Sequence, residues 1–285
     1  MFLYGYHPVR EALRHRPHQV ARVLVSTVRQ GRRRQEIADL CGRHGVPFES
    51  VPERALAAFA GPAHNGMAAE LRPGGRLVSE GRQAGEGWRA AEPGSPGSGP
   101  ESQGAADPDL VVLLEDVQDP RNLGAVLRVC EGAGVGQVLI RDRGSAPITP
   151  AVAKTAAGAS EWLPIERITN SAMTLESLKK AGFWAYGTDP AGQPPWQIDL
   201  TGKVVLCFGG EEKGLRDRTR NLCDGTIGLP MRGRLDSLNL ATAAAAILYE
   251  ALRQRSTGGR QGVGSLESLR PARPGTRLPP DDRSS

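Results

Sequence analysis

The sequence has no two cysteines close together, and this absence argues against stabilisation by a zinc ion or by disulfide bonds. Its four cysteines, Cys41, Cys130, Cys207 and Cys223, are scattered, and no two of them form a C-x-x-C motif. The spacing therefore argues against a zinc ribbon and against a disulfide framework. Cys130 and Cys207 lie inside apolar segments, which predicts that they are small core residues.

Long apolar runs are also missing. No segment approaches the roughly 20 apolar residues that a membrane-spanning helix needs. Residues 1–8 lack the charged flank and the apolar run of a signal peptide. We therefore expect a cytoplasmic protein in a reducing compartment.

Histidine is absent from the second half of the chain. The five histidines are His7, His15, His18, His44 and His64. Histidine is the usual general base near neutral pH. A base in the second half must therefore be a carboxylate, a lysine or arginine with a shifted pKa, or the substrate itself.

What the chain does contain is positive charge. Its 285 residues carry a formal charge of +5, and the isoelectric point is about 9.3. Much of this charge is arginine, which suits phosphate and base recognition. The positive net charge favours a nucleic-acid partner, although a chain that is rich in arginine for other reasons has an equally high isoelectric point.

Residues 1–71 are predicted to form a small α/β domain. Arg32, Arg33 and Arg34 lie in the loop between its first predicted strand and second helix, where they are candidate contacts for RNA phosphates. A solvated surface run explains them equally well. The predicted helices are 6–13, 33–44 and 52–60, and the predicted strands are 20–26, 48–51 and 66–71.

Residues 72–108 and 255–285 have a different composition from the rest. Both segments are dominated by Gly, Pro, Ser and charged residues, which cannot bury enough apolar surface to order a chain. We expect the first to be a flexible linker and the second a disordered tail.

Residues 109–254 are predicted to form a second domain in which strands and helices alternate. Such alternation is typical of a parallel sheet with helices on both faces. The predicted strands are 110–115, 137–141, 183–187, 204–209 and 226–231, and the predicted helices are 123–133, 149–158, 174–181, 215–223 and 241–250.

Three segments of this domain carry candidate chemistry. The first, DPRNLGAVLR at 119–128, places Asn122 at a helix start and Arg128 six residues on, about 600° around the helix. The second, FGGEEKGL at 208–215, follows a strand, and its glycines permit close backbone approach to a ligand. It matches neither G-x-G-x-x-G nor the P-loop, which disfavours a dehydrogenase or a nucleotide hydrolase.

The third segment, LPMRGRLDSLNL at 229–240, leads into the last helix. Ser237 is predicted to be the N-cap, and Asn239 follows in the first turn. A helix N-terminus with a hydroxyl, an amide and nearby arginines can receive an anionic or ribose-like ligand. Each segment also has a plain structural interpretation. Asn122 or Ser237 then caps a helix, Glu211 caps the next one, and Arg128 faces solvent.

In this order and spacing, the three segments resemble the motifs of the SpoU/TrmH family of RNA ribose 2′-O-methyltransferases, in the SPOUT class. The likeness covers most of residues 110–254. YGYHPVREAL at 4–13 resembles the ribosomal-protein-like RNA-binding domain of the branch that methylates a guanosine of 23S rRNA. The resemblance implies S-adenosylmethionine as cofactor, a deep trefoil knot, a homodimer, an RNA substrate and no metal.

The resemblance also implies roles for individual residues. The catalytic set would be Asn122, Arg128, Glu211, Ser237 and Asn239, and the cofactor would contact Gly209, Gly210, Leu229, Met231 and Leu238. Arginine is hard to deprotonate, so we expect Arg128 to lower the pKa of the ribose hydroxyl and to grip a phosphate. Proton abstraction by Arg128 stays open.

The sequence departs from the family pattern at two positions. Glu212 stands where the family usually has glycine, and Ala241 replaces a common small hydroxyl residue. Two rival functions therefore remain: a tRNA methyltransferase of the same family, and a non-catalytic protein of RNA binding or ribosome assembly. The separate N-terminal domain favours rRNA.

Overall fold

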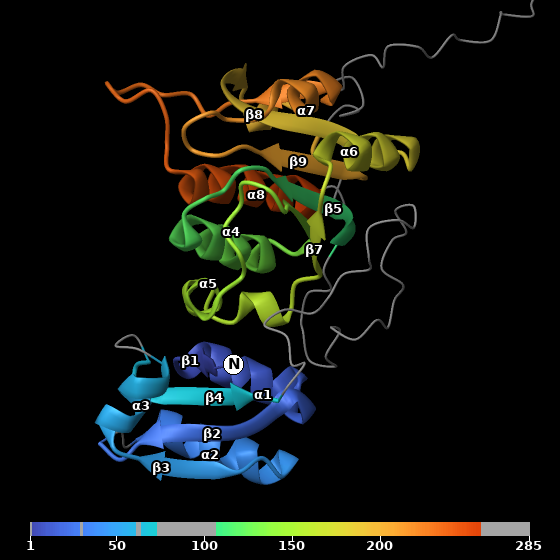
Figure 1. Cartoon of the computed structure of the whole chain (residues 1–285). Coiled ribbons are helices and arrows are strands. Elements are labelled where there is room, and N and C mark those ends of the chain that lie inside the picture. Colours follow the sequence, from blue (N-terminus) through green and yellow to red (C-terminus); the bar gives the residue numbers. More distant parts are fainter. Residues whose placement is uncertain (1, 29–30, 61–63, 73–106, 258–285) are drawn as a thin grey trace, which may run out of the picture.

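The computed structural model describes residues 2–28, 31–60, 64–72 and 107–257. These ranges form a four-stranded sheet followed by a six-stranded sheet. Figure 1 shows the N-terminal unit in blue beneath the larger C-terminal unit. The predicted linker and tail lie almost wholly outside the described residues. Their flexibility and the predicted domain boundaries therefore stay predictions.

The N-terminal sheet has the order β1-β4-β2-β3. Every helix and strand predicted in this domain is present, with small shifts at the ends. The sequence did not reveal β1, because a three-residue edge strand has too few residues for an alternating pattern. The strands are β1 Phe2–Tyr4, β2 Val20–Ser26, β3 Phe48–Val51 and β4 Met67–Leu71, and the helices are α1 Tyr6–His15, α2 Arg32–His44 and α3 Glu53–Ala60.

The C-terminal sheet has the order β10-β8-β9-β5-β6-β7, and all its strand pairs are parallel. The predicted parallel sheet is confirmed. Its strands are β5 Asp107–Leu114, β6 Val135–Arg141, β7 Ile165–Ile168, β8 Trp184–Gln193, β9 Val204–Phe208 and β10 Gly225–Ile227. Its helices are α4 Pro120–Gly132, α5 Pro150–Thr155, α6 Ser171–Lys180, α7 Asp217–Leu222 and α8 Leu240–Thr257.

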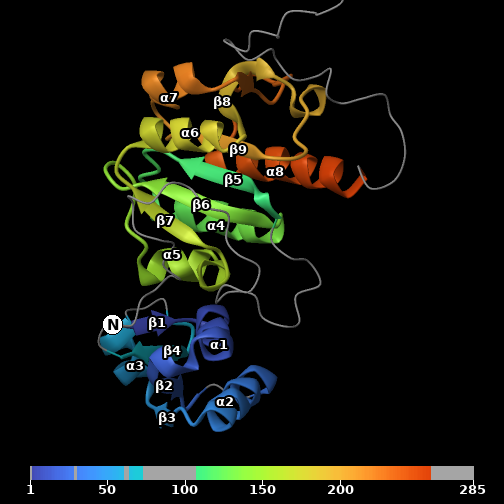
Figure 2. The same ribbon diagram turned by 90° about the vertical axis from the view of Figure 1, so that its right-hand side faces the viewer.

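Central strand β5 shows how helices cover both faces of this sheet. Leu110, Val112 and Leu114 belong to one core cluster with residues of α4 and α8. Val111 and Leu113 belong to another with residues of α6. Figure 2 shows the sheet between these helices. An unbroken apolar strand is the expected sequence for this position, since both of its faces are buried.

The carboxyl ends of β5, β8 and β9 meet at one edge of the sheet, because neighbouring strands are parallel. The first and second motif segments follow β5 and β9 directly, so the fold brings them together. Open α/β sheets bind ligands at this edge. The trefoil knot stays a prediction, since strand order alone does not define how the chain is threaded.

The two domains are packed against each other through α1, α5 and the short helix η2 (Ala159–Glu161). Ala153 of α5 belongs to the core cluster of the N-terminal domain, and Ile148 packs against it. A Cβ on Gly158 would lie 2.8 Å from Cγ of Glu11. At the same junction Arg16 donates to Glu161, and both side chains are largely buried.

Glu161 makes this junction sensitive to pH. Burial raises the pKa of its carboxyl to about 7, against the opposing pull of the Arg16 guanidinium. From about pH 4.5 to about pH 7, the folded protein holds a proton here that the unfolded chain has released. The free energy of unfolding must therefore fall as pH rises through this window.

We predict that Glu161→Gln flattens this dependence, because the amide does not titrate. Thermal unfolding measured across the window should show a shallower fall with pH in the variant than in the wild type. Glu176→Gln is the matched control, since Glu176 lies on α6, away from the junction. Equal pH dependence in wild type and Glu161→Gln would refute the assignment.

Candidate active site

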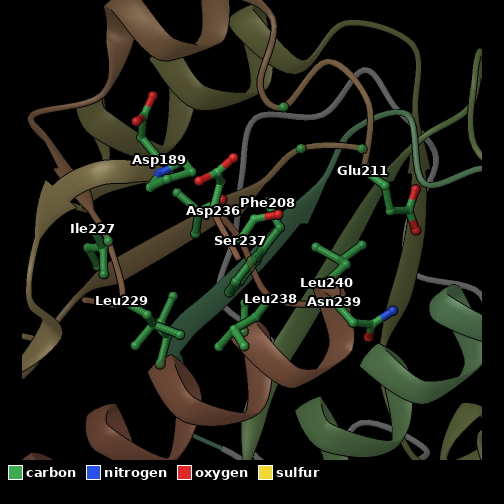
Figure 3. Close-up of a pocket in the computed structure, with 18 of the residues that line it drawn as sticks. Asp189, Phe208, Glu211, Ile227, Leu229, Asp236, Ser237, Leu238, Asn239 and Leu240 are labelled. Carbon is green, nitrogen blue, oxygen red and sulfur yellow. The ribbon is translucent and has the colours of Figure 1, made fainter. Parts of the chain in front are cut away.

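A pocket of about 660 Å³ opens at the carboxyl edge of the C-terminal sheet. Its size is typical of a site for a small molecule or cofactor. All five residues predicted to contact the cofactor line it, namely Gly209, Gly210, Leu229, Met231 and Leu238. Figure 3 shows Glu211 and Asn239 at one end, with Ile227 and Leu229 at the other. Asp189 is labelled on the same side as Ile227, so acidic and apolar side chains lie together there.

Two glycines let the loop after β9 fold tightly against its neighbours. A Cβ on Gly209 would lie 1.9 Å from the carbonyl carbon of Gly214, and one on Gly210 would lie 2.4 Å from the carbonyl oxygen of Asp116. The Gly214 N–H donates to the Gly210 carbonyl over 2.9 Å and closes the turn. Side chains at 209 and 210 would push this wall of the pocket apart.

The same turn explains how the chain accommodates Glu212. The left-handed backbone conformation falls on Gly214, with φ of 62°. Among the non-glycine residues of the described ranges, only Asn65, Asp116 and Ala157 have positive φ. Glu212 therefore causes no backbone strain, and its side chain extends from the exposed tip of the loop.

A hydrogen-bonded relay joins the three motif segments. Asn239 caps α8, because its Oδ1 accepts from the Ala241 N–H over 3.0 Å. Its Nδ2 donates to Oδ1 of Asn122 over 3.0 Å, and Nδ2 of Asn122 donates to Oε1 of Glu211. The prediction that Ser237 is the N-cap was wrong. Ser237 lines the pocket instead.

The direction of this relay is fixed at α8. The cap requires Oδ1 of Asn239 to face the helix, so its amide nitrogen faces Asn122. Asn122 must then present its oxygen to Asn239 and its nitrogen to Glu211. Each amide has a second N–H, and Glu211 has a second carboxylate oxygen. The relay thus leaves one polar group on each member for a ligand.

Helix α4 is held independently of the relay. Asp119 is its N-cap and accepts from the Arg121 N–H over 2.8 Å, with Pro120 at the first helical position. Asn122 lies inside α4 and is not its cap. Glu211 is not a cap either, because α7 starts only after Arg216. Both side chains are therefore available to the site.

Arg128 lies away from the pocket. It is exposed on α4, about 9 Å along the helix axis from Asn122 at 1.5 Å per residue. It is not among the residues that line the pocket. One copy of the chain therefore brings together Asn122, Glu211, Ser237 and Asn239, but not Arg128.

Two acidic residues after β5 anchor the loop that carries Glu211. Glu115 is fully buried and accepts from Oγ1 of Thr219 over 2.8 Å and from the Arg216 N–H over 3.2 Å. Asp116 pairs with Arg141 at 2.9 Å and with Arg216 at 2.8 Å. These contacts fix the start of α7 and hence the end of the loop. Sequence reasoning missed both residues.

The pocket also contains acids that sequence reasoning missed. Asp189 and Asp236 line it together with Glu211 and Glu212, against two cations, Lys213 and Arg220. Asp189 lies on β8 two residues after the last pair with β9, so the rule that ligands bind where parallel strands end could have identified it. Asp236 lies in an exposed loop with no such signal.

These features fit S-adenosylmethionine. The cofactor combines a positive sulfonium with an adenosine group. An acidic lining suits the cation, and the apolar side chains of Ile227, Leu229, Leu238 and Ile247 suit the adenine ring. The glycine turn supplies close backbone access. Among the residues that the structure describes, no group of three or more His, Cys, Asp or Glu could hold a metal ion.

The three predicted RNA-binding arginines have different surroundings. Arg33 stacks on the Tyr6 ring, with 4.9 Å between its guanidinium carbon and the ring centroid. Arg34 donates to Oγ of Ser50 over 2.6 Å and lies over Phe48. Arg32 is exposed. Their predicted role in RNA binding stays a prediction, and the three do not form a single cluster.

Two family models match the chain. Residues 109–249 match the SpoU rRNA Methylase family, and residues 2–74 match the RNA 2′-O ribose methyltransferase substrate binding family. No helix in the described ranges is long and apolar enough to cross a membrane.

Curated relatives cover both domains. The chain is 37% identical to the 23S rRNA (guanosine-2′-O-)-methyltransferase RlmB of Pseudomonas putida over 257 residues, which is 89% of this chain and 96% of the relative. It is 34% identical to the Vibrio cholerae protein of the same name, over 89% and 96% of the two chains.

Solved structures share the fold. The SpoU methyltransferase AviRb from Streptomyces viridochromogenes, in complex with AdoMet, superposes with a TM-score of 0.67 at 24% identity, over 90% of this chain and 91% of that chain. An RNA 2′-O ribose methyltransferase gives a TM-score of 0.69 at 24% identity, over 89% and 88%. With both domains matched, this chain belongs to the SpoU family of RNA ribose 2′-O-methyltransferases, enzymes that use S-adenosylmethionine.

Proposed function

We propose that this enzyme methylates the ribose 2′-hydroxyl of a guanosine in 23S rRNA. The observation that carries the proposal is the relay from Asn239 through Asn122 to Glu211, set beside an acidic, glycine-walled pocket. The names of the curated relatives support the RNA and the nucleotide. An rRNA substrate also supports a cytoplasmic location.

The pocket residues bind and orient the cofactor in this proposal. S-adenosylmethionine supplies a methyl group on a positive sulfonium, so the transfer needs no metal. Gly209 and Gly210 contact it through their backbone, and Leu229, Met231 and Leu238 pack on its adenosine. The carboxylates that line the pocket favour the positive cofactor over its neutral-sulfur product.

The relay orients the ribose that receives the methyl group. The free carboxylate oxygen of Glu211 accepts a hydrogen bond from a ribose hydroxyl, and the free N–H groups of Asn122 and Asn239 donate to oxygen atoms of the nucleotide. Ser237 adds a hydroxyl at the same end. Fixed alignment of two reacting groups can lower a barrier by several kcal/mol, on the order of 7 or more in favourable cases.

Arg128 is the remaining member of the catalytic set. As a fixed positive charge it lowers the pKa of the 2′-hydroxyl and grips the adjacent phosphate. Because Arg128 lies outside the pocket of its own chain, we propose that a second copy supplies it. Helix α8 exposes the small residues Thr242 and Ala246, which permit close contact with another helix in a homodimer.

The activity is tested with purified protein, labelled S-adenosylmethionine and transcripts of 23S rRNA fragments and tRNA. We expect label in an rRNA fragment, and mapping of alkali-resistant linkages should identify one 2′-O-methylguanosine. Label confined to tRNA would favour the tRNA alternative. Cofactor binding without transfer to any RNA would favour the non-catalytic alternative.

We predict that Asn239→Asp separates folding from catalysis. Aspartate caps a helix about as well as asparagine, so thermal stability should change little. A carboxylate cannot donate to Asn122, so the amide of Asn122 turns over and Glu211 loses its donor. Turnover should fall about tenfold to a hundredfold, the scale of a lost hydrogen bond to a charged group.

Asn221→Asp provides the control, because it makes the same chemical change on exposed α7. Thermal unfolding, cofactor affinity by calorimetry and single-turnover methyl transfer should be measured on both variants. Near wild-type transfer by Asn239→Asp would show that the direction of the relay is irrelevant to the reaction.

We predict that Arg128→Ala binds S-adenosylmethionine normally and loses turnover by about a hundredfold or more, as expected for one preorganised charge. Arg128→Lys should rescue little, because a point charge cannot replace the planar fork. A mixed dimer of one Arg128→Ala chain and one Asn239→Asp chain then locates the arginine. If a partner supplies it, one pocket has both residues intact and half of the activity returns.

Two results would count against this arrangement. A mixed dimer with no more activity than the parent variants would mean that Arg128 serves its own chain. A monomer at micromolar concentration in light scattering would remove the partner altogether.

A further inference from the structure

Three guanidinium groups and one imidazole gather where the two domains meet. His7 lies near the start of α1 and is exposed. Although the side chain is exposed, partial desolvation by its neighbours lowers its pKa, and the positive charges of Arg10, Arg33 and Arg128 lower it further, while Glu11 opposes them. These arginines come from α1, α2 and α4, so both domains contribute. We call His7, Arg10, Arg33 and Arg128 the seam cluster.

Tyr6 holds the N-terminal part of the seam cluster in place. The guanidinium of Arg10 lies 5.4 Å from the centre of the Tyr6 ring, and that of Arg33 lies 4.9 Å from it. The His7 ring meets the same ring edge-on, with centroids 5.0 Å apart. The Tyr6 hydroxyl donates to Glu36 of α2, which ties the ring to the second helix.

The seam cluster keeps a surplus of positive charge. Nearby Arg14 pairs with Glu36. Arg10 pairs with Glu11 over 2.5 Å, and Glu11 also faces Arg14 and His15. Neither Arg33 nor Arg128 forms an ion pair with any carboxylate in the described part of the chain. Exposed arginines without a carboxylate partner have N–H groups available for a phosphate.

The seam cluster is also continuous with the active site. Arg128 stands on α4, the helix whose first turn carries Asn122 of the relay. The other members extend from there onto α1 and α2 of the N-terminal domain. In the proposed homodimer Arg128 serves the partner's pocket, so a strand that contacts the partner's relay can pass Arg128 and continue to Arg33 of this chain.

We propose that the seam cluster is one binding site for the phosphodiester backbone of the substrate RNA, shared by the two domains. The proposal rests on the proposed function and deepens it, since it states where the RNA crosses from the substrate-binding domain to the catalytic domain. Arg10, Arg33 and Arg128 contact phosphate oxygens, and His7 lies among them.

RNA binding at this site is coupled to protonation of His7. In the free protein the groups that face His7 are Arg10, Glu11, Arg33 and Arg128, and the three positive charges favour the neutral imidazole. A bound phosphate brings negative charge to the same place and favours the imidazolium. RNA binding must then take up a proton at His7, so affinity rises as pH falls through the range in which histidine titrates.

The test is fluorescence anisotropy with a labelled single-stranded RNA fragment of 23S rRNA. It is measured from about pH 5 to 8, where histidine titrates, and across a series of salt concentrations. We expect the wild type to bind more tightly at low pH and His7→Gln to lose this pH dependence. Arg33→Ala should reduce the slope of log affinity against log salt by about 0.7, the value for one phosphate contact on a single strand.

Arg43→Ala is the matched control. It lies on the same helix α2 and is exposed, about 15 Å along the axis from Arg33 at 1.5 Å per residue. Its salt slope should equal that of the wild type. The proposal is overturned if Arg33→Ala and Arg43→Ala have equal slopes, or if His7→Gln keeps the pH dependence of the wild type.

Failure of the proposed function gives a different result. In that case the wild type still shows proton-linked RNA binding that depends on His7 and Arg33, but no RNA is methylated. Circular dichroism of each variant at each pH checks folding. Arg33 and His7 are both exposed, so loss of binding by either variant with unchanged circular dichroism supports the site.

Discussion

The active site depends on one helix cap. Asn239 satisfies an N–H at the start of α8 with its oxygen, and this leaves its nitrogen to face Asn122. Ser, Asp and Asn are about equally good caps, but only asparagine accepts with one atom and donates from a second, separate atom. The cap thus sets the orientation of two amides and of the carboxylate of Glu211. The residue that caps α8 is therefore the same residue that orients the side chains of the site.

The surrounding packing limits how this arrangement can change. Gly209 and Gly210 have no room for a side chain, since the backbone of Gly214 and of Asp116 fills the space. Buried Glu115 holds the start of α7, so the loop with Glu211 is fixed at both ends. The pocket wall is therefore positioned by backbone contacts, and side-chain variation is left to the tip, where Glu212 stands.

Sequence patterns predicted most of the elements, because apolar runs and helical spacing are strong local signals. The alternation of strands and helices predicted the parallel sheet. They missed β1 and β7, short strands of three and four residues whose sequences, FLY and IERI, show no alternation of apolar and polar residues. The resemblance implied that residues of the three motif segments form one catalytic set, and the parallel strands explain why the first two segments come together. The cap was misassigned to Ser237 because both serine and asparagine satisfy the same local rule. The start of α8 at Leu240 and the bond from the Ala241 N–H identify Asn239 as the cap.

Contacts between distant segments had no comparable signal. The acids Glu115 and Asp116 are ordinary residues at a strand end in the sequence, and their partners on α7 are about a hundred residues away. For Arg128 two signals in the sequence disagree. The resemblance placed it with the catalytic set, and the separation of 600° around the helix indicated a different direction from Asn122. The structure agrees with the angle, since Asn122 is hydrogen-bonded to Glu211 and Asn239 whereas Arg128 is exposed and does not line the pocket of its own chain.

The catalytic helix is tied to the substrate-binding domain by a short series of contacts. Gly124 of α4 fits closely on α5, where a Cβ would lie 2.6 Å from Cβ of Thr155. Ala153 of the same short helix belongs to the core of the N-terminal domain. Helix α4, with Asn122 at one end and Arg128 further along, therefore rests on α5, which rests on the substrate-binding domain. Helix α5 is therefore one of the packed elements that connect the relay with the substrate-binding domain, together with η2, which contacts both α1 and α4.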